Sequence, residues 1–78
     1  MNFQQRIELI ERMDKLIRLE ATGSPRDFAE KLEISESTLY EFLNMMRKLG
    51  ASVSYDKTRE TYFHELPVKF EFGFMAVE

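Results

Sequence analysis

Residues 24–50 read SPRDFAEKLEISESTLYEFLNMMRKLG, and this stretch decides the fold. Ser24 is a good N-cap residue, because its hydroxyl can accept from an unpaired N–H in the first helical turn. Pro25 suits the first helical position, where its missing N–H costs nothing. A short helix is therefore predicted over about 25–32.

A second capping serine, Ser35, follows a tight turn at 33–35 and begins a longer helix. Apolar residues recur on one face of that helix as far as Leu49, and Gly50 supplies the residue that ends it. Two helices joined by a tight turn are thus predicted over about 24–49. This arrangement is a helix-turn-helix.

The chain before this unit predicts an amphipathic helix over 3–20, with Asn2 and Gln5 forming a capping box. The charged residues between its apolar positions, Asp14 among them, are interpreted as a solvated face. The apolar stripe is broad enough to contact more than one neighbour, and a second subunit is one option. Its members are Phe3, Ile7, Leu9, Ile10, Met13, Leu16, Ile17 and Leu19.

After Gly50 the apolar period changes from helical to alternating. A β-hairpin with a charged tip is predicted over about 52–64, and a further C-terminal strand over about 68–75. The expected fold is mainly α with a small β wing (α+β): a three-helix winged helix-turn-helix with a hairpin and a third strand. A chain of 78 residues sets one domain, 1–78, as the ceiling.

Composition argues against catalysis and against bound groups. There is no cysteine, His64 is the single histidine, and the glycines lie too far apart to build a phosphate-binding loop. We therefore expect no enzyme activity, no cofactor and no metal site. No apolar run approaches the roughly 20 residues of a membrane span, and the N-terminus lacks a signal-peptide layout, so a cytoplasmic protein is expected.

Residues 24–40 resemble the "LA..L.IS..TLYR.L" stretch of bacterial helix-turn-helix domains. Such domains stand at the N-terminus of DeoR-type and WYL-type transcription factors and of the biotin-operon repressor. Leu49-Gly50-Ala51 and Ser54-Tyr55-Asp56 resemble the entrance to the wing in that group. The similarity covers roughly residues 6–64. It implies a small DNA-binding transcriptional regulator whose third helix lies in the major groove.

The resemblance also implies which residues face DNA. The third helix would present one exposed side to the groove, and Thr38 and Tyr40 match positions that commonly touch phosphates in relatives. Arg26, Lys57 and Arg59 would be the natural phosphate or minor-groove contacts. The full set of expected DNA-binding residues is Arg26, Glu36, Ser37, Thr38, Tyr40, Glu41, Asn44, Lys48, Lys57 and Arg59.

The charge pattern departs from that group and keeps a second function open. Net charge is −3, and the acidic and basic residues of the third helix cancel, as do those of the wing. Phosphate-driven affinity is therefore expected to be weak. The alternative is a winged-helix protein-protein interaction or dimerisation module that has lost DNA binding.

The aromatic residues near the C-terminus have two interpretations. Phe70, Phe72 and Phe74 either pack against the first helix of the same chain or form, with that helix, a homodimer interface. A homodimer would suit a protein that reads two half-sites on DNA, and it is the favoured of the two.

Overall fold

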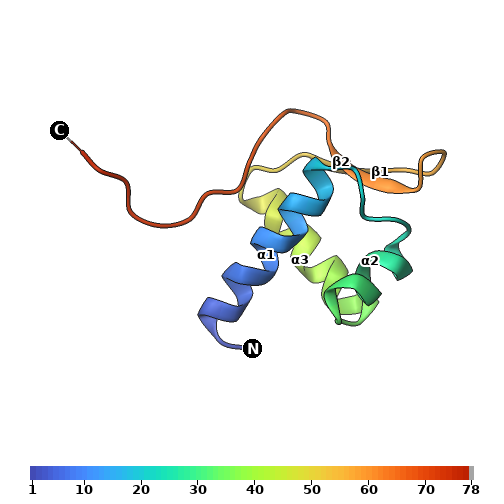
Figure 1. The fold of residues 1–78 in the computed structure, drawn as a ribbon, viewed down its shortest axis with the longest axis horizontal. Coiled ribbons are helices and arrows are strands. Elements are labelled where there is room, and N and C mark those ends of the chain that lie inside the picture. The colour runs from blue at the N-terminus through green and yellow to red at the C-terminus, as the bar shows by residue number, and fades with distance from the viewer. Residues whose placement is uncertain (78) are drawn as a thin grey trace.

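The computed structural model describes residues 1–77 and has three helices followed by a two-stranded hairpin. The helices are α1 (Phe3–Arg18), α2 (Pro25–Leu32) and α3 (Glu36–Lys48), and the strands are β1 (Val53–Asp56) and β2 (Thr61–His64). Figure 1 shows the hairpin beside the C-terminal end of α1. The chain after β2 first arches back over the helices, and its last residues then run away from the body as an extended segment. The three-helix and hairpin layout predicted from the sequence is confirmed.

Each helix begins at the capping residue that the sequence indicates. Asn2 accepts from the Gln5 backbone N–H at 2.8 Å and donates its own backbone N–H to the Gln5 side chain, which completes the capping box. Ser24 caps α2, and Ser35 caps α3 by accepting from the Thr38 N–H at 3.1 Å. These local hydrogen bonds satisfy the unpaired donors at each helix start.

The core lies where the three helices and the hairpin meet. From α3 it takes four of the five residues of the predicted apolar face, Leu39, Phe42, Leu43 and Met46. The fifth, Leu49, is exposed, because α3 ends at Lys48 and Leu49 is its C-cap. The other buried hydrophobic residues are Leu9, Ile10, Met13, Ile17, Phe28, Ala29, Leu32, Val53 and Tyr62. The two ends of the expected apolar stripe on α1 do not join this core, since Phe3 and Leu19 are exposed.

Two expectations for α1 are corrected. The helix ends at Arg18, short of the expected residue 20, because Glu20 adopts a left-handed φ of 51° and the Ala21 N–H turns back to the Leu16 carbonyl. Asp14, which the charge pattern placed on a solvated face, is buried with 2% of its surface exposed. Its carboxylate faces the hairpin and the C-terminal segment.

The predicted strand at 68–75 does not form: within the described residues the sheet consists of β1 and β2. Phe70 donates its backbone N–H to the Asp14 side chain at 3.0 Å, where a strand would donate to a neighbouring strand. Gly73 has a φ of 136°, outside the range of a regular strand. The alternating apolar residues therefore follow an extended segment with no strand partner.

Candidate nucleic-acid interface

One side of α3 is free of the core and carries most of the expected DNA-binding residues. Tyr40 is the large side chain among them, with 46% of its surface exposed, and Thr38 is half-buried beside the cap. The Thr38 hydroxyl accepts from the Ser35 hydroxyl at 3.0 Å, so it serves the cap of the helix. The exposed members of this α3 face are Glu36, Ser37, Tyr40, Glu41, Asn44 and Lys48.

The turn between α2 and α3 orients this face. Glu33 adopts a left-handed conformation (φ 58°, ψ 41°) and ends α2, while the Ile34 N–H donates to the Ala29 carbonyl at 3.0 Å. The left-handed residue reverses the chain within the short connection, and Ile34 packs against the core. A non-glycine residue in this region is strained by about 1 kcal/mol.

Arg59, expected on the wing as a phosphate contact, is committed to partners within the protein. Its guanidinium forms ion pairs with Asp56, at 2.8 Å, and with Glu20, and it lies 5.7 Å from the centre of the Phe63 ring. The hydrogen bonds that Arg59 donates hold the pKa of the Asp56 carboxyl below its usual value. Arg59 therefore joins the wing to the turn that follows α1.

Two other arginines also have partners within the protein. Arg26 lies at the start of α2 with most of its side chain exposed, and its Nε lies 3.5 Å from the Glu30 carboxylate in an exposed ion pair. Arg47, at the end of α3, donates to the Val53 carbonyl at 3.1 Å and to Asn44 at 3.1 Å. Arg47 thus joins α3 to β1. The side-chain oxygen of Asn44, one of the expected DNA-binding residues, accepts one of the hydrogen bonds from Arg47.

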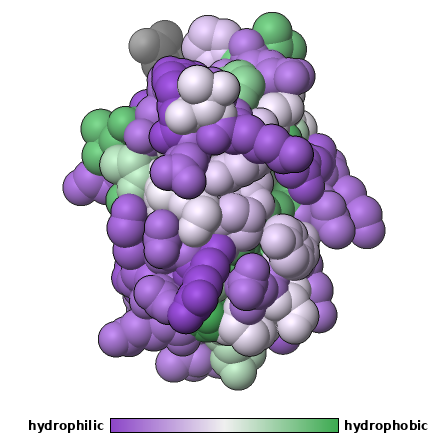
Figure 2. Space-filling model, turned by 90° about the vertical axis from the view of Figure 1, so that its right-hand side faces the viewer, coloured by the Kyte–Doolittle hydropathy of each residue, from purple (hydrophilic) through white to green (hydrophobic). Residues whose placement is uncertain are grey.

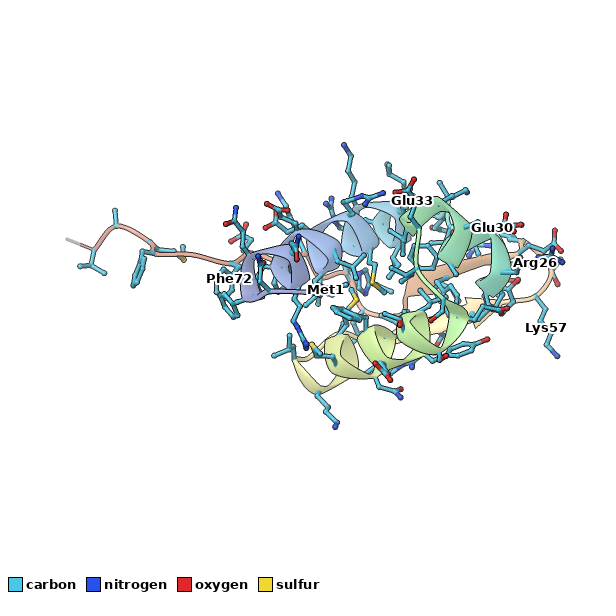
Figure 3. All side chains as sticks on the ribbon, turned by 90° about the horizontal axis from the view of Figure 1, so that it is seen from below. Met1, Arg26, Glu30, Glu33, Lys57 and Phe72 are labelled. Carbon is cyan, nitrogen blue, oxygen red and sulfur yellow. The ribbon has the colours of Figure 1, made fainter. Side chains whose placement is uncertain are left out.

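Lys48 and Lys57 are the expected contacts whose ammonium groups enter no ion pair or hydrogen bond among residues 1–77. Lys57 stands at the tip of the wing, at the same end of the molecule as Arg26 (Figure 3). Figure 2 views the molecule from that end and shows a surface made mostly of hydrophilic residues. The geometry therefore brings together a polar face of α3 and a polar wing, with few unpaired cations.

A buried polar cluster that the sequence did not indicate lies on the other side of the hairpin. The Asp14 carboxylate accepts from Arg18 Nε at 2.9 Å, from His64 Nε2 at 2.8 Å and from the Phe70 backbone N–H at 3.0 Å. Burial alone would raise the pKa of Asp14, but the hydrogen bonds from Phe70, His64 and Arg18 outweigh it, and the pKa lies below its usual value. The cluster joins α1, β2 and the C-terminal segment.

His64 Nδ1 is buried and has no hydrogen-bond partner within the described residues. The ring borders a cavity of about 280 Å³ under the C-terminal segment, where Met46, Leu49 and Phe70 supply apolar walls. Because Nε2 donates to an ionised carboxylate, the orientation of the ring is set by Asp14. We therefore give His64 a structural role, in which it joins β2 to α1 through Asp14.

Thr22 holds the start of β2 against the chain that follows α1, and the sequence offered no signal for it. Its hydroxyl is wholly buried, accepts from the Tyr62 backbone N–H at 2.9 Å and lies 3.1 Å from the Thr61 hydroxyl. A residue at a predicted helix break is ordinarily assumed to be exposed. The long separation along the chain, 40 residues, explains why no local pattern reveals the contact.

The geometry defines a small α+β domain with two tightly connected helices and a hairpin beside them. No protein-family model matches the chain, and no characterised protein and no solved structure matches it significantly. No helix within residues 1–77 is long and apolar enough to cross a membrane.

Proposed function

We propose that the chain is a small DNA-binding regulator of transcription, of the bacterial winged helix-turn-helix kind and acting in the cytoplasm. In this proposal α3 enters the major groove and the hairpin flanks it as the wing. The observation that carries the proposal is the division of α3 into two sides. One side is buried in the core, and the other is polar, exposed and free of other elements.

The exposed side has the chemistry that base reading requires. Ser37, Tyr40 and Asn44 lie three and four residues apart, so they follow one line along the helix. Amide and hydroxyl groups hydrogen-bond to base edges, and a carboxylate such as Glu41 accepts from cytosine N4. The α3 face therefore supports recognition by hydrogen bonding more than by phosphate neutralisation.

The few lysine and arginine side chains that are free to contact phosphates support a modest affinity for DNA. Lys57 and Lys48 are available to phosphates, and Arg26 is released from Glu30 at little cost because exposed ion pairs contribute little. Arg59 and Arg47 hold the fold together instead. We infer that non-specific binding is weak and that a specific sequence is needed for a stable complex.

The test is fluorescence anisotropy, first with a mixed-sequence duplex at about 50 mM and about 200 mM salt, where phosphate-led binding weakens steeply. Selection from a random duplex pool then identifies a preferred site. Tyr40→Ala and Asn44→Ala should each weaken the selected complex about 10-fold or more, since each removes base or backbone contacts. Glu11→Ala, on the exposed side of α1, is the matched control and should leave binding unchanged.

Unchanged binding by both α3 variants would remove the proposed docking of α3. Absence of binding to any selected duplex would remove DNA as the partner. The internal pairing of Arg59 and Arg47 favours one alternative in that case, a winged-helix module that binds protein through the α3 face. Capture of a specific protein by the wild-type chain, lost with Tyr40→Ala, would then support that alternative.

A further inference from the structure

The C-terminal segment carries a row of three aromatic rings, Phe70, Phe72 and Phe74. The row begins against the core of the domain and continues into solvent. Phe70 is half-buried against the core, and its backbone is held by Asp14. Phe72 stacks on Phe70, with ring centres 6.4 Å apart, and packs edge-to-face with Phe3, with ring centres 5.6 Å apart. Phe74, the next member of the row, is completely exposed.

These rings belong to a larger apolar surface, which we call the apolar end patch. It combines Phe3, at the start of α1, with the C-terminal segment, and Figure 3 shows its member Phe72 toward the end of the molecule opposite Lys57. All members are exposed large hydrophobic residues. They are Phe3, Phe72, Phe74, Met75 and Val77.

From these features we infer that the apolar end patch binds the same patch of a second copy of this chain, forming a two-fold symmetric dimer. The area supports this occupant. A monomeric protein of 9.3 kDa exposes about 5,000 Å² by the usual scaling of surface with mass. This chain exposes 5750 Å², an excess of roughly 750 Å². A standard-size interface buries about 800 Å² on each partner.

Charge supports a second copy rather than a charged partner. Residues 72–77 carry no charged side chain, and neither do residues 1–5 at the start of α1. Two copies of a chain with net charge −3 therefore meet at this patch without bringing charged side chains of these segments together.

The backbone of the segment is also available. No hydrogen bond within residues 1–77 involves the backbone N–H or C=O groups of residues 71–77. Unpaired extended backbone of this kind pairs readily with another chain. In a symmetric contact each segment supplies the same donors and acceptors to its partner, so the two copies satisfy each other.

The dimer does not depend on the proposed function, because the patch lies away from the wing tip (Figure 3). The surface of α3 that carries Tyr40 and Asn44 remains outside it. If both inferences hold, the dimer presents two α3 helices and predicts a two-fold symmetric DNA site. Oligomeric state is measured without DNA, so failure of one inference is distinguishable from failure of the other.

Sedimentation equilibrium of the 78-residue chain, at concentrations up to about 200 µM, tests the dimer. We expect a mass of twice 9.3 kDa in the upper part of this range. The double variant Phe72→Ser/Phe74→Ser should weaken association about 30-fold or more, since buried aromatic residues dominate interface energies. Phe74→Ser alone should also weaken it, and this variant removes no contact within the monomer's aromatic row.

The matched control is Leu19→Ser/Leu66→Ser, which removes two leucines that are as exposed as Phe3 but lie outside the patch. This control should dimerise as the wild type does. Circular dichroism during thermal unfolding checks that all variants fold. A wild-type chain that is monomeric throughout the range would overturn the inference, as would a dimer that the phenylalanine substitutions leave unchanged.

Discussion

The carboxylate of Asp14 lies 2.8 Å from Nε2 of His64, which stands 50 residues further along the chain. The same carboxylate accepts from the Phe70 backbone N–H and from Arg18. One side chain of α1 therefore holds the end of the hairpin and the beginning of the C-terminal segment. The row of aromatic rings begins at this attachment point, because Phe70 carries the ring on which Phe72 stacks.

Asp14→Asn should destabilise the domain by about 2–4 kcal/mol, because it removes one member of a buried, hydrogen-bonded charged group. An asparagine has one acceptor oxygen, so its NH₂ group would face at least one of the N–H donors that now point at the carboxylate. Urea unfolding followed by circular dichroism measures the loss. Glu11→Gln, an exposed neutralisation on the same helix, is the control and should change stability by less than about 0.5 kcal/mol. Equal losses in the two variants would show that Asp14 contributes nothing special.

Stability should fall at acid pH through Asp14. The folded-state pKa of Asp14 lies below its unfolded value of about 4, because the hydrogen bonds from Phe70, His64 and Arg18 outweigh burial. A depressed pKa contributes stability above the unfolded pKa, and this contribution is lost as pH falls from about 4 through the folded pKa. Urea unfolding between about pH 7 and pH 3 should show the decline, and it should be shallower in Asp14→Asn. A variant as acid-sensitive as the wild type would assign the decline to other carboxylates.

Glu33→Gly should stabilise the domain by about 0.5–1 kcal/mol. Glu33 has a φ of 58°, and glycine relieves the strain of this left-handed conformation, partly offset by greater freedom in the unfolded chain. Glu30→Gly is the matched control, because Glu30 lies within α2 and glycine should there cost about 1 kcal/mol. The two substitutions remove the same side chain with opposite expected signs. Destabilisation by Glu33→Gly would show that its side chain matters more than its backbone.

Lys57→Ala should weaken DNA binding more than Arg59→Ala, although both residues lie on the wing. Arg59 is already paired with Asp56 and Glu20, whereas Lys57 has no such partner among the described residues. The plot of log affinity against log salt should have a slope of about −2 to −3 per chain, and Lys57→Ala should reduce it by about 1. Lys15→Ala, an exposed lysine on α1, should leave the slope unchanged. A larger effect of Arg59→Ala would show that the ion pairs open on DNA.

Local signals in the sequence determined most of the secondary structure. The capping residues Asn2, Ser24 and Ser35 act on N–H groups within three residues of themselves, so their meaning does not depend on the rest of the fold. The apolar face of α3 was likewise predicted from its spacing and is confirmed in the core. The tight turn over 33–35 was also predicted, whereas the left-handed φ of 58° at Glu33 within it is a finding of the structure.

The tertiary structure determines which polar side chains have hydrogen-bond or ion-pair partners within the protein and which are free. Asp14, Arg59 and Thr22 all find partners about 40 residues or more away in the chain, and no local pattern distinguishes them from solvated neighbours. The same holds for the alternating phenylalanines. Alternation predicts a strand, but a strand exists only where another strand accepts its hydrogen bonds. Here the Asp14 carboxylate takes the Phe70 N–H instead, and the aromatic row runs on into solvent. Local patterns along the chain were therefore enough to predict the helices, their caps and the hairpin. Contacts between distant residues set which cations are free, which charge is buried and which apolar residues are exposed.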